Sequence, residues 1–337
     1  MTGAPPTLLL TREEVRGLVR MAQVIASVED AFVAYSEGAV DQPPYMGLHL
    51  STEGAEIDFK ACYHRGEETV SLKASSGGFR DNPDRCGLPN GMGTVLLFDG
   101  TSGALLCAMD GSLLTGLRTG AAGAVSVKAM ARHNARVVGV LGTGTQARMQ
   151  IRAIREVMPI EEIHAWGRTR ASLEAFAAEI EAEHSIPVVS HRSADDVADA
   201  ADVIVTTTRA SGIVLRAGAV RPGTHIVAIG ADQPGKQELD PALFDRARVA
   251  VDALAQCREK GELQHALAAG TATGPITEIG AVLAGKTPGR ASAEEITIFD
   301  STGMAIQDCT TAAAILSEAR ARGIGTRFDF LAPMSRE

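Results

Sequence analysis

Residues 137–150 read VVGVLGTGTQARMQ, an apolar run that leads through glycines into a helical pattern. Gly142, Gly144 and Ala147 have the spacing GxGxxA. The first glycine permits a tight turn, the second lets backbone N–H groups approach a pyrophosphate, and the small third residue allows close packing of helix on strand. The helix N-terminus adds partial positive charge. The stretch predicts a dinucleotide-binding loop formed by Gly142, Thr143, Gly144, Thr145, Gln146 and Ala147.

Strand-like and helical patterns alternate after this loop. Such alternation is typical of a parallel sheet with right-handed crossovers, so we predict a doubly wound α/β domain of the Rossmann type. We also predict a helix over 301–323 with Ser301 as its N-cap. The main strand-like runs are 161–167, 202–208, 225–230, 248–253 and 294–300.

The second strand of the series bears on the choice of cofactor. An NAD site usually has an acidic residue about 20 residues after the glycine motif, where it binds the ribose 2′-OH. Here the strand ends in HAWGRT (164–169), with Arg168 and Thr169 at its tip and no carboxylate. An arginine can pair with a 2′-phosphate, which favours NADP over NAD. The alternative is that Arg168 only stacks on adenine, which leaves NAD usable.

The first 130 residues have a different texture. Helical spacing runs to Tyr35, and Thr11 with Glu14 fits a capping box. Short β-type runs separated by turn residues fill 45–110, and a helical pattern follows over 115–132. We therefore expect a second, α+β domain.

Composition limits the functional class. The 337 residues include 32 Lys and Arg against 41 Asp and Glu, for a net charge of −9, so neither nucleic acid nor an anionic membrane is an expected partner. The five cysteines are scattered, with no spacing suited to zinc, and we predict no metal site. They read as reduced thiols of a cytoplasmic protein.

Several blocks of sequence, in order, resemble the ornithine cyclodeaminase/μ-crystallin family. The resemblance implies hydride transfer between a nicotinamide and the α-carbon of an amino or imino acid. It also implies a homodimer and a Rossmann domain (131–302) inserted into a discontinuous substrate-binding and dimerisation domain (1–130 with 303–337). The blocks are QPP at 42–44, LRTGAAGA at 117–124, GTGTQA at 142–147, IGADQPGKQELD at 229–240 and EITIFDSTGMAIQD at 295–308.

The resemblance assigns three charged residues to the chemistry. Arg118 matches the arginine that binds the substrate carboxylate, and a guanidinium fork suits bidentate binding. Lys73 matches an active-site lysine that binds carboxylate or moves protons. Asp232 matches an aspartate near the substrate nitrogen. Because Asp232 lies among Gly, Pro and Gly, a simple turn role is the alternative.

The chain also departs from the family at three positions. Tyr45 follows QPP where many members have an arginine, so one carboxylate ligand is absent. Asp58 and Lys60 stand in IDFK where ornithine-converting members have IELM, and strand alternation places them on one face. Lys60 could replace the lost cation, although a solvated strand lysine is the plain alternative.

Residues at other strand ends complete the expected cofactor site. The carboxyl edge of an open parallel sheet is where cofactors bind, so one of Thr206–Thr208 is expected at the ribose. Thr208, Gly230 and Ser301 are our candidates. The resemblance brings the turn at Ser301 to the carboxamide side of the nicotinamide.

Three functions fit these residues. The leading one is NAD(P)H-dependent reduction of an α-imino acid to an L-amino acid with a small or acidic side chain, iminosuccinate being the leading substrate. The second is a cyclodeaminase that uses bound NAD⁺ and releases ammonia, which a cation at Lys60 disfavours for ornithine or lysine. The third is a non-enzymatic, crystallin-like binding protein, which intact Arg118, Lys73 and Asp232 disfavour.

Overall fold

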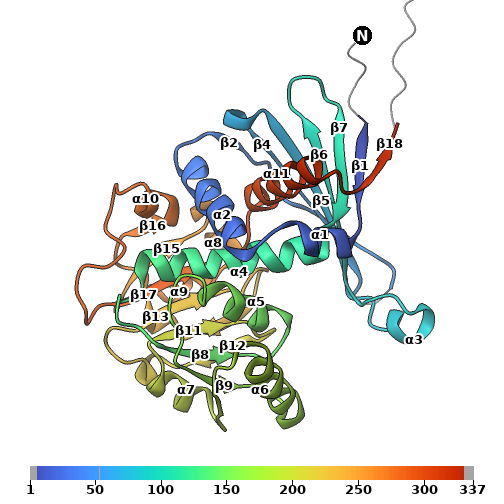
Figure 1. Cartoon of the computed structure of the whole chain (residues 1–337). Helices are drawn as coiled ribbons and strands as arrows, with labels where there is room; N and C mark the ends of the chain where they lie inside the picture. The colour runs from blue at the N-terminus through green and yellow to red at the C-terminus, as the bar shows by residue number, and fades with distance from the viewer. Residues whose placement is uncertain (1–5, 53, 330–337) are drawn as a thin grey trace, which may run out of the picture. The chain divides into compact units, whose positions relative to one another are not determined.

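The computed structural model describes residues 6–52 and 54–329. The chain divides into two compact units (Figure 1). The first takes the chain up to Arg118 and again from Met304, and the second is Thr119–Gly303. The division falls inside helix α4 (Gly111–Met130), whereas the sequence pattern sets a domain boundary after this helix.

The first unit is built on one large sheet. All its neighbouring strands run antiparallel except the parallel pair β1–β7. In spatial order the strands are β18 (Thr326–Phe328), β1 (Thr7–Leu10), β7 (Leu105–Asp110), β6 (Met92–Asp99), β5 (Thr69–Gly77), β4 (Glu56–His64) and β2 (Val40–Asp41), with β3 (Met46–His49) also on β4.

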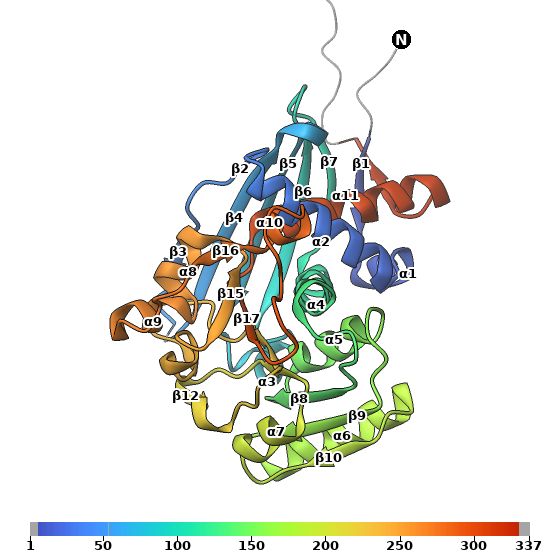
Figure 2. The same ribbon diagram turned by 90° about the vertical axis from the view of Figure 1, so that its left-hand side faces the viewer.

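Helices of the first unit pack on one face of this sheet (Figures 1 and 2). Val95 on that face is fully buried. The predicted capping box at Thr11 and Glu14 is confirmed, and it starts α1 after strand β1. The opposite face carries partly exposed apolar side chains. Helix α11 (Ala305–Arg322) packs on β4, β5 and β6, α1 (Arg12–Leu18) packs on β7, and α2 (Met21–Ser36) packs on α11. The first turns of α4 and the short helix α3 (Asn82–Cys86), which lies away from the sheet in Figure 1, complete the helices of this unit.

The second unit contains the predicted parallel sheet, so the Rossmann fold class is confirmed. Every neighbouring pair in the sheet is parallel. Its first five positions follow the Rossmann order 3-2-1-4-5. The spatial order is β10 (Val188–Ser190), β9 (Glu162–Trp166), β8 (Val137–Leu141), β11 (Val203–Thr206), β13 (His225–Ala228), β17 (Ile296–Asp300), β15 (Ala247–Val251) and β16 (Ile276–Glu278).

Helices and a small sheet surround these strands. The two-stranded sheet pairs β12 (Ser211–Leu215) with β14 (Gln237–Leu239). Besides the rest of α4, the helices are α5 (Thr145–Ile154), α6 (Arg170–His184), α7 (Ala194–Ala200), α8 (Leu254–Lys260), α9 (Leu263–Ala269) and α10 (Ile279–Leu283).

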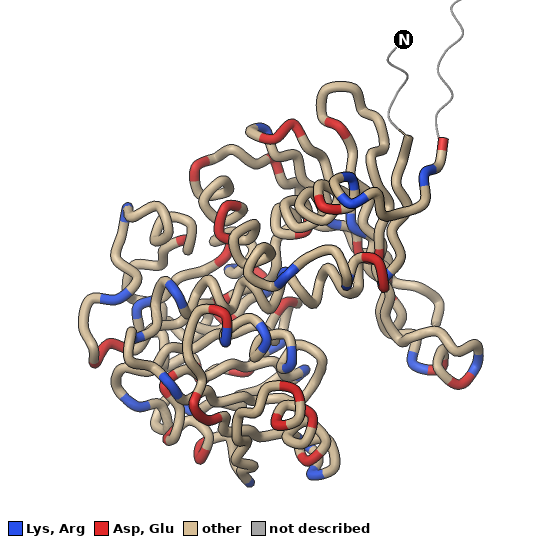
Figure 3. Tube along the Cα trace, viewed as in Figure 1, with Lys and Arg blue, Asp and Glu red and all other residues tan. Residues whose placement is uncertain are grey.

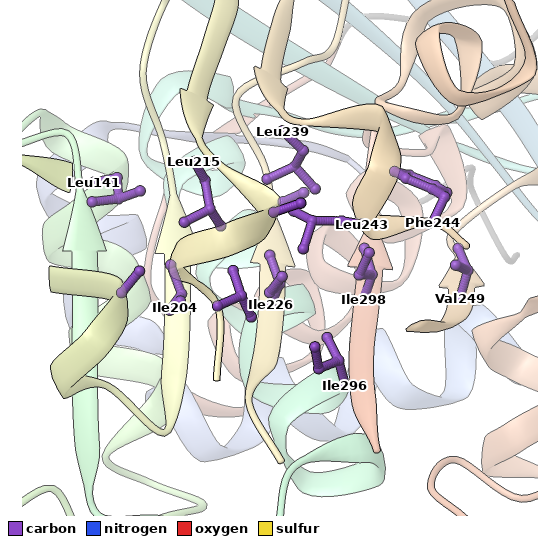
Figure 4. Packing of buried hydrophobic residues seen from close by; sticks show 14 of the residues in the cluster. Leu141, Ile204, Leu215, Ile226, Leu239, Leu243, Phe244, Val249, Ile296 and Ile298 are labelled. Carbon is purple, nitrogen blue, oxygen red and sulfur yellow. The ribbon is translucent and has the colours of Figure 1, made fainter. Parts of the chain in front are cut away.

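One hydrophobic cluster of the second unit lies on one face of its parallel sheet (Figure 4). Ile204, Ile226 and Ile298, from three adjacent strands, are fully buried there. Burial of such a side chain contributes about 1.5–3 kcal/mol. This continuous apolar layer holds the strand ends, and the loops that follow them, at one rigid edge.

The prediction that a helix starts with Ser301 as N-cap is wrong. Ser301 Oγ donates to Asp252 Oδ2 over 2.9 Å, and the backbone N–H groups of Thr302 and Gly303 donate to the same oxygen. Gly303 has a φ of 77°, a left-handed conformation that interrupts a right-handed helix. Helix α11 therefore begins only at Ala305, because Asp252 holds the preceding turn in a loop conformation.

Charges of both signs are interspersed along the chain (Figure 3). Among the described residues, no helix combines the length and apolar character that crossing a membrane requires.

Candidate active site

Three buried charges meet in the first unit. Lys73 on β5 is 3% exposed, Arg118 on α4 is 6% exposed and Asp308 on α11 is 1% exposed. Lys73 Nζ lies 2.6 Å from Asp308 Oδ2, and Arg118 Nε donates to Asp308 Oδ1 over 3.0 Å. Lys73 Nζ also donates to Thr115 Oγ1 over 3.4 Å. One carboxylate thus bridges two cations, and the cluster carries one net positive charge.

The cluster shifts the ionisation of its own members. Burial is the main influence on Lys73 and lowers its pKa to about 8, against the attraction of Asp308, while Arg118 lowers it further. Burial opposes the charge on Asp308, but Lys73 and Arg118 outweigh it and lower the pKa of that carboxyl. At neutral pH Asp308 is therefore ionised, and Lys73 is close to releasing its proton.

The predicted substrate residues Lys60 and Asp58 belong to the same sheet face as Lys73. Lys60 pairs directly with Lys73 across β4 and β5, so both side chains project to one side. Asp58 lies two residues from Lys60 on that side. A Cβ on Gly47 would lie 2.9 Å from Asp58 Oδ1 and 3.4 Å from the Tyr45 ring, so Tyr45 and Asp58 flank the same glycine. The first unit therefore gathers these predicted substrate residues and Lys73 on one side of its sheet.

The sequence alone did not reveal a role for Asp308. The residue lies inside the block EITIFDSTGMAIQD, but its partners lie far away in sequence. In the folded chain Asp308 is buried in α11, beside the buried polar residues Gln307 and Thr311. Aspartate is almost never fully buried unless it is paired, so this position indicates cationic partners.

The predicted phosphate loop has the expected backbone. Gly142 has a φ of 104°, and a Cβ there would lie 3.0 Å from the carbonyl oxygen of Thr207. At Gly144 a Cβ would meet no atom within 4 Å, so that side of the loop is open for a ligand to approach. Gly144 is the N-cap of α5 and offers no side-chain acceptor to its first N–H groups. Ala147 is fully buried. These features fit a pyrophosphate at the helix N-terminus.

The remaining loop residues differ in their contacts. Thr143 Oγ1 donates to Ser172 Oγ over 3.2 Å, whereas Thr145 and Gln146 form the first turn of α5. Arg148 was not among the predicted residues, yet its Nη1 donates to the carbonyl oxygen of Thr143 over 2.7 Å. Arg148 thereby holds the carbonyl oxygen of Thr143 in the loop.

Arg168 and Thr169 follow strand β9. Thr169 is the N-cap of α6 and accepts a hydrogen bond from the backbone N–H of Ser172. Arg168 is exposed. Beside them a hollow lies at the carboxyl ends of β9 and β10, where Arg192 and His191 are among the lining residues. Arg170 and Arg192 line this hollow together with Glu174, which pairs with Arg170, so arginines lie near the place where a Rossmann fold receives the adenosine ribose.

Thr208, after β11, and Gly230, after β13, were both predicted as cofactor-site residues, and the side chain of Glu238 binds both. The backbone N–H groups of Thr208 and Gly230 both donate to Glu238. Asp232, further along the second loop, is half-exposed and lies 2.6 Å from Lys236 Nζ through its Oδ1. Asp232 thus has a local partner in its own turn, which adds an ion pair to the turn role considered from sequence.

The sheet order and the glycine loop together define a dinucleotide-binding protein of the Rossmann class. The family model described as "Ornithine cyclodeaminase/mu-crystallin family" matches residues 6–323. The alanine dehydrogenase of Archaeoglobus fulgidus is 39% identical over 326 residues, which cover 96% of this chain and 98% of the relative.

Two solved structures extend the comparison. An archaeal alanine dehydrogenase dimer with bound NAD is 37% identical, with a TM-score of 0.89 over 96% of this chain and 99% of that chain. The iminosuccinate reductase of Paracoccus denitrificans in complex with NAD⁺ is 36% identical, with a TM-score of 0.89 over the same shares of both chains. The chain belongs to the ornithine cyclodeaminase/μ-crystallin family, as the sequence blocks predicted.

Proposed function

We propose that the protein is an NAD(P)H-dependent oxidoreductase that reduces an α-imino acid to an L-amino acid. The observation that carries this proposal is the buried Lys73–Asp308–Arg118 cluster in a chain that also has a dinucleotide loop. A net positive, largely dehydrated cluster suits the carboxylate of such a substrate. Relatives that are an alanine dehydrogenase and an iminosuccinate reductase support the same reaction class.

Each residue of the cluster has a distinct part in this reaction. The guanidinium of Arg118 binds the substrate carboxylate, while its Nε stays on Asp308 and fixes the orientation of the fork. A bound nicotinamide would supply the hydride to the α-carbon. Lys73, with a pKa of about 8, is suited to give a proton to the substrate nitrogen near neutral pH. Asp232 would stabilise the positive charge of a protonated imine.

The side chain of the substrate is proposed to be small or acidic, with iminosuccinate as the leading candidate. Lys60 is in register with Lys73 on the same sheet face, so it can supply a cation for a second carboxylate. The iminosuccinate reductase relative is 37% identical over 318 residues. Asp58 on that face opposes a second negative charge, so the substrate screen has to include an alanine-type imine.

The cofactor is proposed to be NADPH in preference to NADH. Support comes from Arg168 and from Arg170 and Arg192 at the neighbouring hollow. The relatives with solved structures hold NAD or NAD⁺, so the preference for NADP rests on the side chains of this chain alone. We further propose a cytoplasmic homodimer with a substrate and dimerisation domain (1–130 with 303–337) and a Rossmann domain (131–302).

A steady-state assay tests the reaction. NADPH and NADH oxidation would be followed with iminosuccinate, with pyruvate plus ammonia and with cyclic ketimines. Turnover with at least one α-imino acid, abolished in Arg118→Ala, is the expected result. Absence of turnover with every imine would refute the proposal.

The second candidate is a cyclodeaminase, which the ion-paired Asp232 and the family membership allow. Proline formation from ornithine without added cofactor would support it. Lys60 disfavours it, because the terminal ammonium of ornithine would meet a cation on the same face.

A further inference from the structure

Glu238 is a buried carboxylate that the proposed reaction does not use. It lies on β14 and is fully buried, which is rare for glutamate unless its oxygens are satisfied. Oε2 accepts from Thr206 Oγ1 over 2.6 Å and from the backbone N–H of Gly230 over 2.9 Å. Oε1 accepts from the backbone N–H of Thr208. One side chain therefore satisfies three donors.

These donors belong to two loops at the carboxyl edge of the parallel sheet. Thr206 ends β11 and Thr208 follows it, while Gly230 follows β13 and leads to Asp232. The contact requires glycine at 230, because a Cβ there would lie 2.6 Å from the carbonyl oxygen of Thr208 and closer still to Glu238 Oε2. Glu238 thus fixes the spacing of the two loops that follow the adjacent strands β11 and β13.

The position of Glu238 is itself fixed by further buried carboxyl groups. The backbone N–H groups of Glu238 and Leu239 donate to Glu262 over 2.7 and 3.1 Å. The backbone N–H groups of Glu262 and Leu263 donate to Asp300 over 3.0 and 2.9 Å. All of these residues are buried, so strand β14 cannot shift without breaking several hydrogen bonds in a dry interior.

We propose that Glu238 is a positioning residue that orients the loops after β11 and β13 for the ribose and nicotinamide half of the cofactor. This inference rests on the proposed function, because it assigns that half of the cofactor to Thr208 and Gly230. Glu238 acts only through these loops and contacts neither substrate nor cofactor. In the proposed site the glycine loop and Arg168 bind the adenosine half. A change at Glu238 should therefore weaken binding of NADPH but not of a ligand that has only the adenosine half.

Glu238→Gln tests the selectivity, because it keeps the side-chain shape but turns an amide NH₂ toward a backbone donor. We expect the Kd of NADPH to rise about tenfold and kcat to fall about a hundredfold, as misplacement of reacting groups by about 1 Å can do. The Kd of 2′,5′-ADP, which lacks the nicotinamide half, should stay within about twofold of the wild-type value. Thr206→Val removes one donor and should give a smaller change in the same direction.

The matched control is Asp202→Asn. Asp202 accepts backbone N–H groups at the start of β8, at the opposite edge of the sheet, so its substitution should lower the Tm without changing the ratio of the two affinities. If Glu238→Gln lowers the Tm but leaves that ratio and kcat unchanged, its role is only structural and the inference fails. If Glu238→Gln does not fold, an unchanged ratio and kcat in Thr206→Val would overturn the inference instead. The affinity ratio needs no turnover, so wild-type inactivity toward imines would refute the proposed function separately.

Discussion

At the scale of single residues, Asp308 offsets the electrostatic cost of burying Lys73 and Arg118 together. Two cations buried side by side would repel each other and lose their hydration, which costs several kcal/mol for each ion. Asp308 lies within 3.0 Å of both and offsets part of that cost. It does not cancel the positive charge, so the cluster keeps attraction for one anion. The cluster therefore suits the proposed carboxylate ligand, and Lys73 suits the proposed proton transfer.

The pH dependence of imine reduction follows from Lys73. The amine is a cation below its pKa of about 8 and neutral above it. If the cation donates the proton, kcat/KM falls about tenfold for each pH unit above that value. Asp308→Asn removes a charge that raises the pKa of Lys73, so the fall should begin at lower pH. A pH–rate profile of both proteins measures the shift.

Thr115→Val is the matched control for this profile. It removes a hydroxyl that accepts from Lys73 but changes no charge, so the profile should keep its midpoint. A profile that is unchanged in Asp308→Asn would mean that Lys73 is not the titrating group.

The second residue-scale prediction concerns Lys60. If Lys60 binds a second carboxylate, Lys60→Glu should lower kcat/KM for iminosuccinate at least about tenfold, since a hydrogen bond between charged groups contributes about 1.5–3 kcal/mol. The value for imino-alanine should change about threefold or less. Lys60→Gln, which removes the charge but keeps a polar side chain, should lower kcat/KM for iminosuccinate by an intermediate factor. Equal losses on both substrates would exclude Lys60 as a ligand of the second carboxylate.

The third residue-scale prediction concerns cofactor choice. Arg168→Ala should raise the KM for NADPH about tenfold or more, because a charge-assisted contact with the 2′-phosphate is lost. The KM for NADH should change little. Thr169→Ala, which removes only the cap of α6, is the control for local unfolding. If both KM values rise equally, Arg168 stacks on adenine and does not select the phosphate.

At the scale of elements, the β8–α5 connection places the phosphate loop by means of two different glycines. Gly142 needs its hydrogen side chain because of its φ of 104° and its approach to Thr207. Gly144 is in ordinary extended backbone with open space around it. Glycine is therefore required at position 142 by the backbone conformation. At position 144 we expect it to be required by the approach of the ligand.

Alanine substitutions separate these two requirements. Gly142→Ala should lower the free energy of unfolding by about 1–3 kcal/mol, because it strains the backbone. Gly144→Ala should leave the Tm unchanged but raise the Kd of NADPH at least about tenfold, because the new methyl group occupies the approach of the pyrophosphate. Thermal unfolding and NADPH fluorescence titration measure both. A destabilised Gly144→Ala with normal affinity would contradict this division.

The elements of the second unit were easier to predict from the sequence than their order. The apolar strands and the glycine loop are local signals, so the parallel sheet and the backbone of that loop could be predicted. The position of β17 between β13 and β15 could not be, because strand order depends on packing between distant segments. The N-cap expected at Ser301 is absent for the same reason, since its partner Asp252 is far away in sequence. Asp308 and Glu238 likewise show their roles only when the chain is folded.

At the scale of the whole molecule, the sheet of the first unit has an apolar face that is partly exposed to solvent. Leu72 and Leu96 are opposite each other in register and half-buried on this face, and Phe59 lies on the same side. Leu9, Met46 and Leu48 are among the exposed large hydrophobic residues. Contiguous apolar surface of this kind marks an interaction site, and the archaeal alanine dehydrogenase relative is described as a dimer.

We therefore predict a homodimer that uses this sheet face. Leu96→Glu should shift the protein to monomers in analytical ultracentrifugation, because burying an unpaired carboxylate costs at least about 2 kcal/mol. Ile213→Glu, at an exposed apolar residue of the second unit, is the control and should leave the dimer intact. A monomeric wild-type protein, or a Leu96→Glu protein that remains dimeric, would contradict the prediction.

Hydride transfer to the α-carbon of an imino acid is the step on which the proposed function depends. Transfer of deuterium from the cofactor to the product tests this step directly. The protein would be incubated with NADPH deuterated at C4 on either face and with iminosuccinate or pyruvate plus ammonia. We expect an L-amino acid that carries one deuterium at the α-carbon from one of the two labelled cofactors, and none in Arg118→Ala. If neither labelled cofactor gives a labelled amino acid, or if NADPH is oxidised without an amino-acid product, the proposed hydride transfer does not occur.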